Sequence, residues 1–368
     1  MKKKVVIIEN SNSWLYKIRR DTVMALLKEN FEVYILCPPG DYKSEMVSWG
    51  CKYIDTNLDR RGKNVLNEIS LFKFYIKMLR KIKPNIVLTY TIKPNLYGGL
   101  ACRLLNIPCI NNITGLGTGL NSGKFLKAFL ISFYKISFKK SALVFFQNRK
   151  DMETILENRI VKGRYKLIPG SGVNLKDFKF TEYPIGKNPV KFLYMGRVMK
   201  DKGIDEFLEA AKIIKDKYKN TKFYILGFIE KSQDHYRNLL KDYQSKGYIE
   251  YLGYQSDVKS FIEESHCLIQ PSHSEGLSNV LLEAAAMGRP LIASNINGCK
   301  ETIDEGKNGF TFEVNNSKDL ANKIEKFIKL SYEEKITMGK NSRIKVENEF
   351  DRKIVVNSYL NAIKDKIN

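Results

Sequence analysis

Two carboxylates with a fixed spacing are the first residues of this chain that could act together in chemistry. Glu275 and Glu283 lie in the stretch QPSHSEGLSNVLLEAAAMGRP, residues 270–290. Apolar residues at 267–269 predict the end of a buried strand, and 278–287 a helix that ends at Gly288. A rise of ~1.5 Å per residue separates the carboxylates by ~10–12 Å, beyond the roughly 5–9.5 Å of a glycosidase pair. This distance suits the sugar and the ribose of a nucleotide sugar, and the amides of the helix N-terminus between them suit its diphosphate.

The same stretch resembles the E-x7-E signature of retaining glycosyltransferases of family 4, which have the GT-B fold. Its fuller pattern is P-S-x-x-E-G, five residues, L-E-A, three residues and G-x-P. The resemblance implies that Glu275 binds donor sugar hydroxyls and Glu283 the ribose. It places the residues that follow Glu275 at the donor: Gly276, Leu277 and Ser278. The alternative is that both acids are ordinary turn and helix residues on the surface.

Two cations stand in a second pattern, G-R-x-x-x-x-K-G, at 196–203. Arg197 and Lys202 follow an expected strand at 191–195 and precede a helix from 204, a place where cations can clamp a diphosphate. The family has the same spacing and uses both residues in this way. With Glu275 they are the predicted catalytic residues, whereas the alternative is two solvated surface cations. Gly253, after the strand expected at 249–252, is predicted to lie beside the nucleobase, as in relatives.

Length and composition exclude several protein classes. A chain of 368 residues with 43% apolar residues predicts two globular domains. Six cysteines without metal-ligand spacing indicate reduced, buried thiols in a cytoplasmic protein. The apolar run before Glu9 is too short for a signal peptide, and no run approaches the ~18 residues of a membrane span.

The positive charge is concentrated in the N-terminal half. Residues 1–180 contain 32 Lys+Arg and 13 Asp+Glu, and residues 181–368 contain 30 and 27. No acidic residue occurs between 69 and 150. This half is therefore expected to meet an anionic partner, which could be phospholipid, polyprenyl diphosphate or nucleic acid. The alternative is a solubilising charge without a specific partner.

Strands alternate with helices along the chain, which predicts an α/β protein with two doubly wound parallel sheets. Expected strands are 3–9, 31–37, 86–91, 109–113 and 143–147 in the first half, and 191–195, 223–227, 249–252, 267–270, 291–294 and 310–314 in the second. The first domain is expected over 1–180 and the second over 190–350, with 170–189 as a linker. By analogy with GT-B proteins, the last helix, about 351–368, is expected to cross back to the first domain.

The acceptor is expected at the loops after the first domain's strands, because such sheets bind ligands at the carboxyl ends of their strands. The candidate residues are Ser13 in a polar turn at 10–14, Lys93, and the glycines Gly115 and Gly117 of the TGLGTG loop. That loop is either a ligand contact or a simple turn; similar loops occur in the polyprenyl-linked-sugar branch of the family. The three histidines, His235, His266 and His273, all lie in the second half. The histidine that many relatives place in the first domain is therefore absent.

Residues 122–140 predict an amphipathic helix that combines lysines and aromatic residues. One arc of the helix contains Phe125, Leu126, Phe129, Leu130, Phe133 and Ile136. The lysines lie on the other side, with Ile131, Tyr134 and Phe138 among or beside them. A basic face with aromatic residues suits the headgroups of an anionic leaflet, and the alternative is a packed helix with snorkelling lysines.

The sequence therefore predicts a retaining glycosyltransferase that moves a sugar from a UDP-sugar to a polyprenyl-diphosphate-linked acceptor. It would work at the cytoplasmic face of the membrane, in surface polysaccharide or glycan synthesis. No D-x-D occurs, so neither a metal nor another cofactor is expected. The alternatives are a GT-B-fold UDP-sugar epimerase, which would act on the donor alone, and a nucleic-acid-binding protein, suggested only by charge.

Overall fold

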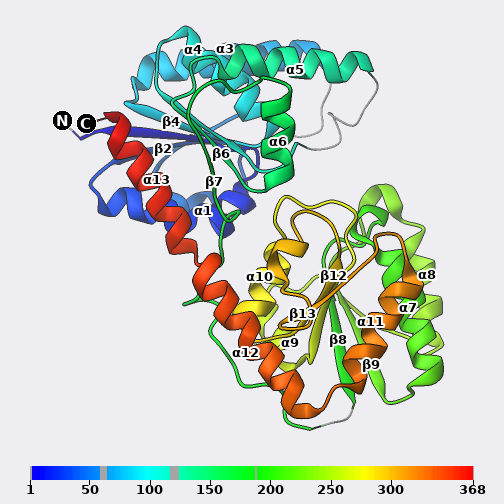
Figure 1. Cartoon of the computed structure of the whole chain (residues 1–368). Helices are drawn as coiled ribbons and strands as arrows, with labels where there is room; N and C mark the ends of the chain where they lie inside the picture. Colours follow the sequence, from blue (N-terminus) through cyan, green and yellow to red (C-terminus); the bar gives the residue numbers. More distant parts are fainter. Residues whose placement is uncertain (1, 59–63, 117–123, 187–188, 368) are drawn as a thin grey trace. The chain divides into compact units, whose positions relative to one another are not determined.

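The chain folds into two compact α/β units (Figure 1). The computed structural model describes residues 2–58, 64–116, 124–186 and 189–367. The first unit comprises residues 1–171 and 353–368, and the second comprises residues 172–352. The last helix of the chain, α13 (Arg352–Ile367), thus lies almost wholly in the first unit, although the residues before it belong to the second.

The first unit is built on a parallel sheet with the strand order β3-β2-β1-β4-β5-β6-β7. The strands are β1 (Lys4–Ile8), β2 (Glu32–Cys37), β3 (Lys52–Asp55), β4 (Ile86–Tyr90), β5 (Cys109–Ile113), β6 (Leu143–Phe146) and β7 (Tyr165–Leu167). The central strands are apolar runs because both faces of the sheet are covered. The sequence predicted five of the strands within two residues at each end, and it missed β3 and β7, which have no fully buried residue.

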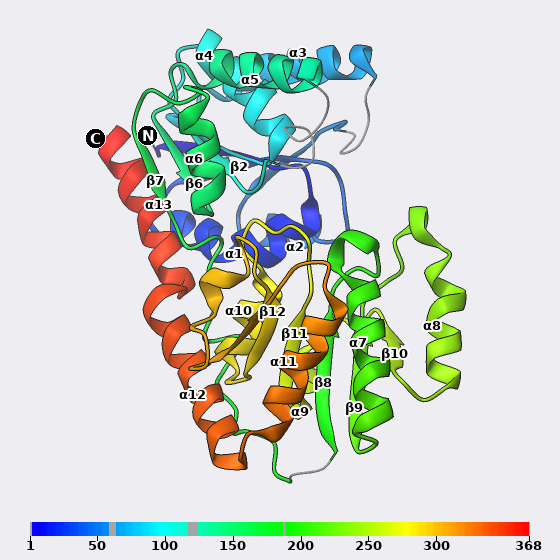
Figure 2. The same ribbon diagram turned by 45° about the vertical axis from the view of Figure 1, so that its right-hand side comes forward.

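Helices cover both faces of this sheet (Figure 2). They are α1 (Asn12–Lys28), α2 (Lys43–Ser48), α3 (Val65–Ile82), η1 (Pro94–Gly98), α4 (Gly99–Leu104), α5 (Lys124–Phe138), α6 (Arg149–Glu157) and α13. Val5 and Ile7 pack in the core beneath α1 and α13. Val6 and Ile8, which point to the opposite face, pack with α3 and α4.

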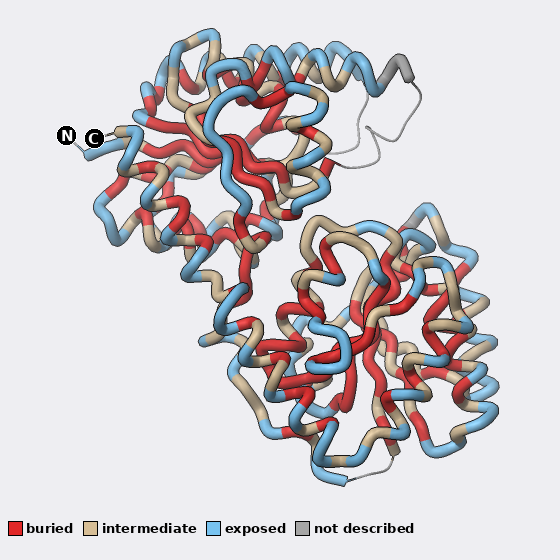
Figure 3. The backbone as a smooth tube through the Cα atoms, viewed as in Figure 1, coloured by how far each residue is buried: buried red, intermediate tan, exposed pale blue. Residues whose placement is uncertain are grey.

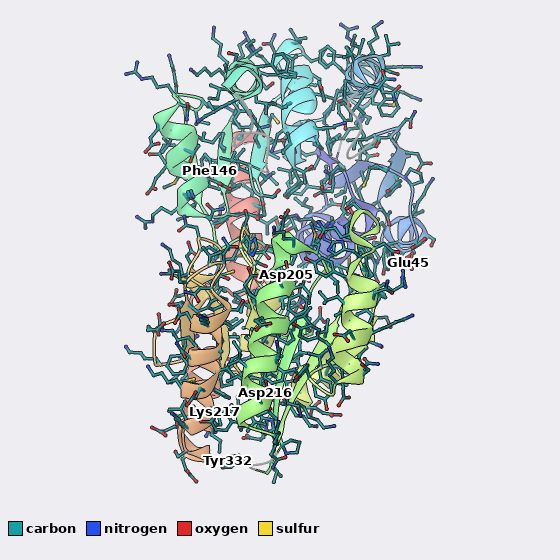
Figure 4. All side chains as sticks on the ribbon, turned by 90° about the vertical axis from the view of Figure 1, so that its right-hand side faces the viewer. Glu45, Phe146, Asp205, Asp216, Lys217 and Tyr332 are labelled. Carbon is teal, nitrogen blue, oxygen red and sulfur yellow. The ribbon has the colours of Figure 1, made fainter. Side chains whose placement is uncertain are left out.

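The second unit has a parallel sheet with the strand order β10-β9-β8-β11-β12-β13. Its strands are β8 (Val190–Met195), β9 (Thr221–Leu226), β10 (Glu250–Gly253), β11 (Cys267–Gln270), β12 (Leu291–Ser294) and β13 (Gly309–Phe312). Its longer helices are α7 (Ile204–Lys217), α8 (Tyr236–Ser245), α9 (Lys259–Glu264), α10 (Asn279–Ala286), α11 (Ser317–Lys329) and α12 (Tyr332–Glu349). Lys217 lies at the end of α7 (Figure 4). Its ammonium forms an ion pair with Glu325 of α11 at 2.6 Å.

The segment predicted to be a linker, residues 170–189, is for the most part a packed portion of the second unit. Arg289 is fully buried, and its guanidinium donates hydrogen bonds to the carbonyls of Thr181 (3.1 Å) and Glu182 (3.0 Å). The Tyr183 hydroxyl donates to the carbonyl of His266 at 3.1 Å. The boundary between the units therefore lies at residues 171–172. The scattered Gly and Pro residues suggested a linker because the residue that holds this segment in place, Arg289, lies about a hundred residues later in the chain.

The helix predicted over 122–140 is α5, and its packed side chains come from both the predicted apolar arc and the side predicted to be basic. Tyr134 and Phe138, expected beside the lysines, are buried against β6 and α6. Phe129 and Ile136, expected in the apolar arc, are 62% and 47% exposed. Exposed and more buried stretches alternate along this helix (Figure 3). Residues 122–123, and the side chains of residues 124–126, lie outside the described part of the chain. Among the described residues, no helix is long and apolar enough to cross a membrane.

Candidate active site

Glu275 is the centre of a hydrogen-bond network after β11. Its Oε1 accepts hydrogen bonds from Lys202 Nζ (2.5 Å), the Ser272 hydroxyl (2.8 Å) and Gln270 Nε2 (3.4 Å). Gln270 and Ser272 are buried, and Gln270 Nε2 also donates to the Ser272 hydroxyl at 2.6 Å. These bonds fix the carboxylate before any ligand binds. They all reach Oε1, so Oε2 is the oxygen left for a ligand.

Lys202 reaches Glu275 because two loops of the second unit are in close contact. Lys202 ends the short helix η3 (Lys200–Lys202), which follows β8, and Gly203 comes next with φ +70°. A Cβ atom on Gly203 would lie 1.9 Å from the carbonyl oxygen of Pro271, so only glycine allows this approach. The side chains of Lys202 and Glu275 are both more than four-fifths buried. The predicted cation and the predicted carboxylate therefore form one ion pair.

His273 connects the same loop to α7. Its backbone N–H donates to the carbonyl of Asp201 at 3.0 Å, and its Nε2 lies 3.2 Å from Glu206 Oε1. Glu206 is buried in the first turn of α7. The loop that contains Glu275 is thus held on both sides of Gly203, and the position of the carboxylate relative to Lys202 is fixed.

The helix after Glu275 begins with free amides, as the sequence predicted. α10 runs from Asn279 to Ala286, and Ser278 is its N-cap. The amide of Leu281 donates to the Ser278 hydroxyl at 3.4 Å. Within the described ranges, no group accepts a hydrogen bond from the amides of Gly276 and Leu277. These two N–H groups and the N-terminus of α10 attract an anion.

A small cavity of about 210 Å³ lies beside the start of α10. Glu283 and Arg197 line it, together with Met195, Gly196, Leu226, Gly227, Phe228, Tyr254, Gln255, Val258 and Val280. Phe228 and Tyr254 lie with their ring centroids 6.5 Å apart. Gly253 (φ +68°) precedes Tyr254, and its carbonyl accepts the amide of Gly227 at 2.8 Å. The cavity has aromatic and aliphatic walls with one acid and one cation, which suits a planar base and its ribose.

Arg197 is held by an acid that the sequence analysis did not single out. Its Nη1 donates to Glu230 Oε2 at 2.9 Å, and the Glu230 side chain is mostly buried. The backbone joins the same two loops, because the Val198 amide donates to the Phe228 carbonyl and the Glu230 amide to the Val198 carbonyl. The guanidinium is therefore oriented in advance, which lowers the entropy cost of binding an anion.

The candidate acceptor residues of the first unit do not form one cluster of free groups. Lys93 forms an ion pair with Glu68 of α3, and both side chains are mostly buried. Ser13 was expected in a polar turn, but α1 begins at Asn12, so Ser13 is an exposed residue of its first turn. Gly115 has φ +142° with open space around it, and Gly117 lies outside the described residues.

The sequence analysis missed several residues that support the site. Gln270, Ser272, Glu206 and Glu230 position the predicted residues, and Phe228 and Tyr254 form the cavity walls. A signal existed for some of them, because Gln270 and Ser272 lie within the recognised motif. Glu206 and Glu230 have no sequence signal, since they approach the site only through the packing of α7 and of the loop after β9.

Two family models match the chain over most of its length. "Glycosyl transferases group 1" matches residues 176–345, which include every donor-site residue named above, and "Glycosyl transferase 4-like" matches residues 4–148. The chain belongs to glycosyltransferase family 4. The enzyme is similar to the N,N'-diacetylbacillosaminyl-diphospho-undecaprenol alpha-1,3-N-acetylgalactosaminyltransferase of Campylobacter jejuni, with 26% identity over 97% of each chain. It is also similar to the capsular polysaccharide biosynthesis glycosyltransferase CapM of Staphylococcus aureus, with 28% identity over 92% of this chain and 91% of CapM.

Solved structures place the glycosyltransferase in the GT-B fold. A glycosyltransferase from Rickettsia africae matches with a TM-score of 0.82 and 21% identity over 100% of this chain and 99% of the other. Anabaena HepE, solved in complex with UDP and glucose, matches with a TM-score of 0.80 and 14% identity over 99% and 100%. The predicted fold class and the predicted enzyme class are thus confirmed.

Proposed function

We propose that the enzyme transfers a sugar from a UDP-sugar to a polyprenyl-diphosphate-linked sugar with retention of the anomeric configuration. The observation that carries the proposal is the Lys202–Glu275 ion pair beside the free amides of Gly276 and Leu277. The relatives support the acceptor class: those from Campylobacter jejuni and Escherichia coli are named as transferases acting on diphospho-undecaprenol-linked sugars. The second of these names UDP-Gal as its donor.

The donor diphosphate is assigned to Arg197, Lys202 and the two free amides. Cleavage of the sugar–phosphate bond leaves negative charge on the nucleotide, and fixed donors placed at that charge lower the barrier. Glu275 Oε2 is assigned to the donor sugar hydroxyls. Because Glu275 and Glu230 hold the two cations in place, little reorganisation accompanies the reaction.

The nucleoside is assigned to the cavity beside α10. Tyr254 and Phe228 would flank the uracil ring, and Glu283 would accept hydrogen bonds from the ribose hydroxyls. A vicinal diol is a good partner for one carboxylate, since both hydroxyls can donate to it.

The reaction is proposed to need no divalent metal. Two cations and a helix N-terminus supply the positive charge that a chelated metal would otherwise bring to the leaving diphosphate. Within the described residues there is no group of three or more His, Cys, Asp or Glu side chains that could hold a metal ion.

The outer surface of α3 and α5 is proposed to bind an anionic membrane at its cytoplasmic face. Both helices pack against α4. Exposed apolar residues on this surface are Val65, Leu66 and Ile69 of α3 and Phe129 and Ile136 of α5. Exposed cations among them are Lys73, Lys77, Arg80 and Lys81 of α3 and Lys127 and Lys135 of α5. Such a mixture suits the headgroup region, and the six free buried cysteines suit a reducing compartment.

A donor panel tests the proposal. Purified enzyme is incubated with UDP- and GDP-sugars and EDTA, with and without bacterial lipid extract. We expect release of one nucleotide only when lipid is present. Interconversion of the donor without lipid would show an epimerase instead, and activity that EDTA abolishes and a divalent metal restores would contradict the metal-independent mechanism. For the membrane surface, Phe129→Asp should reduce sedimentation with phosphatidylglycerol vesicles, whereas the exposed control Ile213→Asp on α7 of the second unit should not.

A further inference from the structure

An arginine is buried in the first unit with no hydrogen-bond acceptor or ion-pair partner among the described residues. Arg19 lies in the first half of α1 and is 6% exposed. Its guanidinium carbon lies 4.3 Å from the centroid of the Tyr90 ring. Throughout the described part of the chain, no atom accepts a hydrogen bond from this guanidinium and no carboxylate forms an ion pair with it. The cation–π contact with Tyr90 stabilises the guanidinium by less than its burial costs. Arg19 could therefore still gain from a hydrogen-bond acceptor.

The Tyr90 hydroxyl beside this guanidinium is also buried and poorly satisfied. Tyr90 is the last residue of β4 and is fully buried. Among the described residues its hydroxyl makes no well-aligned hydrogen bond, although the hydroxyl of Tyr359 lies close enough to interact with it. Burial raises the pKa of Tyr90 well above its ordinary value, so the hydroxyl keeps its proton and can donate. The neighbouring Tyr359 of α13, whose ring centroid is 6.0 Å away, already donates to Asn112 Oδ1 at 2.6 Å.

One acid lies in this cluster but does not occupy the guanidinium. Glu9 follows β1, is buried, and accepts a hydrogen bond from the Asn10 amide at 2.9 Å. The negative charge of Glu9 raises the pKa of Tyr90 and Tyr359, whereas the positive charge of Arg19 lowers both pKa values. Glu9 and Arg19 therefore both lie near these two tyrosine side chains. Glu9 therefore stabilises the charge of Arg19 from a distance. The N–H groups of the Arg19 guanidinium remain available to a ligand.

The cluster lies where a doubly wound sheet binds ligands. β1 pairs with β2 on one side and with β4 on the other, so the strand order reverses between β1 and β4. Ligands of open α/β sheets bind outside the carboxyl ends of the strands at this reversal. Glu9 and Tyr90 are at the carboxyl ends of these two strands.

We infer that Arg19 and the Tyr90 hydroxyl form an oxyanion-binding subsite of the first unit, filled by a phosphate of the acceptor's diphosphate. The inference rests on the proposed function, which supplies the diphosphate. The planar fork of a guanidinium matches two oxygens of a phosphate, and a phenol adds a third donor. A carboxylate of an acidic acceptor sugar offers the same chemistry, so the experiment separates the two sources.

Binding is measured without transfer, by calorimetry with the donor site filled by saturating UDP. The probes are farnesyl diphosphate, farnesol and glucuronate. We expect farnesyl diphosphate to bind the wild-type enzyme and Arg19→Gln to weaken that binding at least tenfold. Binding of glucuronate alone with the same dependence on Arg19 would keep the subsite and overturn its diphosphate assignment. No binding of either anion would overturn the subsite.

Two further variants separate ligand binding from a structural role. Tyr90→Phe removes a hydroxyl that makes no well-aligned hydrogen bond among the described residues of the free enzyme. The unfolding midpoint should therefore fall little, whereas farnesyl diphosphate binding should weaken severalfold. Arg20→Gln removes the same charge at the next position, which is exposed, and should leave binding within twofold of wild type. If Arg19→Gln does not fold, Tyr90→Phe decides. Affinities in both site variants equal to that of Arg20→Gln would refute the inference, whereas absence of transfer by the wild-type enzyme would count against the proposed function alone.

Discussion

Gly203 offers a sharp test of the donor site, because the chain contains a matched control. Gly203→Ala introduces a methyl group where φ is +70° and where the Pro271 carbonyl oxygen would be 1.9 Å away. Gly247→Ala introduces the same group at φ +72°, with no atom within 4 Å. Both variants bear the ~1–2 kcal/mol cost of a left-handed conformation. Only Gly203→Ala must also push away the loop that contains Glu275.

The size of the effect follows from this clash. To reach ordinary contact the methyl group and the Pro271 carbonyl must separate by roughly 1.5 Å, which moves Glu275 relative to Lys202. A misplacement of about 1 Å can cost ~10²-fold in rate, so kcat/KM for the donor should fall by about that factor. Overpacking should also lower the free energy of unfolding by about 1–3 kcal/mol more than in Gly247→Ala.

The assay combines urea unfolding with initial rates of donor turnover at varied donor concentration. Gly247→Ala should keep kcat/KM near the wild-type value while losing stability. If Gly203→Ala retained donor kinetics equal to those of Gly247→Ala, the close contact between the two loops would have no role in placing Glu275, and the reasoning would fail.

Three further predictions concern activity, stability and pH. Glu275→Gln should lower kcat by ~10²-fold or more with the fold intact, because the amide neither neutralises Lys202 nor binds sugar hydroxyls as a charged acceptor. Transfer rates near the wild-type value would contradict the assignment of Glu275 to the active site. Arg289→Met should lower the free energy of unfolding by about 2–4 kcal/mol, because it removes the donors to a buried carbonyl at residue 262 and to partly buried carbonyls at residues 181 and 182. The exposed control Arg164→Met should change the free energy of unfolding little in the same urea titration. Burial lowers the pKa of His266 to about 4, so the unfolded chain, with a histidine pKa near ~6.5, binds the proton first as pH falls. The stability that His266 contributes is therefore complete at pH values above its pKa in the unfolded chain. It is lost as the pH falls from there towards 4, at up to about 1 kcal/mol per pH unit. Between pH 7 and pH 5, the free energy of unfolding should therefore decrease less in His266→Gln than in the wild type.

The elements around the donor site were predictable because their signals are local. β11, β12 and the turn before α10 were predicted within a residue, since short apolar runs next to Gly, Ser and Pro mark a strand end and a helix start. The two sequence motifs did not predict that Lys202 and Glu275 form an ion pair. It follows only from the side-by-side position of β8 and β11 in the sheet, which brings the loops after these strands together.

The sequence by itself determined the two α/β units, the donor motif and the excess of positive charge in the first half, because each depends on residue type and short-range order. The tertiary structure alone decided which face of α5 is buried, since amphipathicity cannot choose between two faces that both contain apolar residues. It also decided that Lys93 is paired with Glu68 and that Arg19 is buried without a hydrogen-bond acceptor among the described residues. Partners that lie far apart in the chain meet only when the helices pack on the sheet, and that packing has no local signature in the sequence.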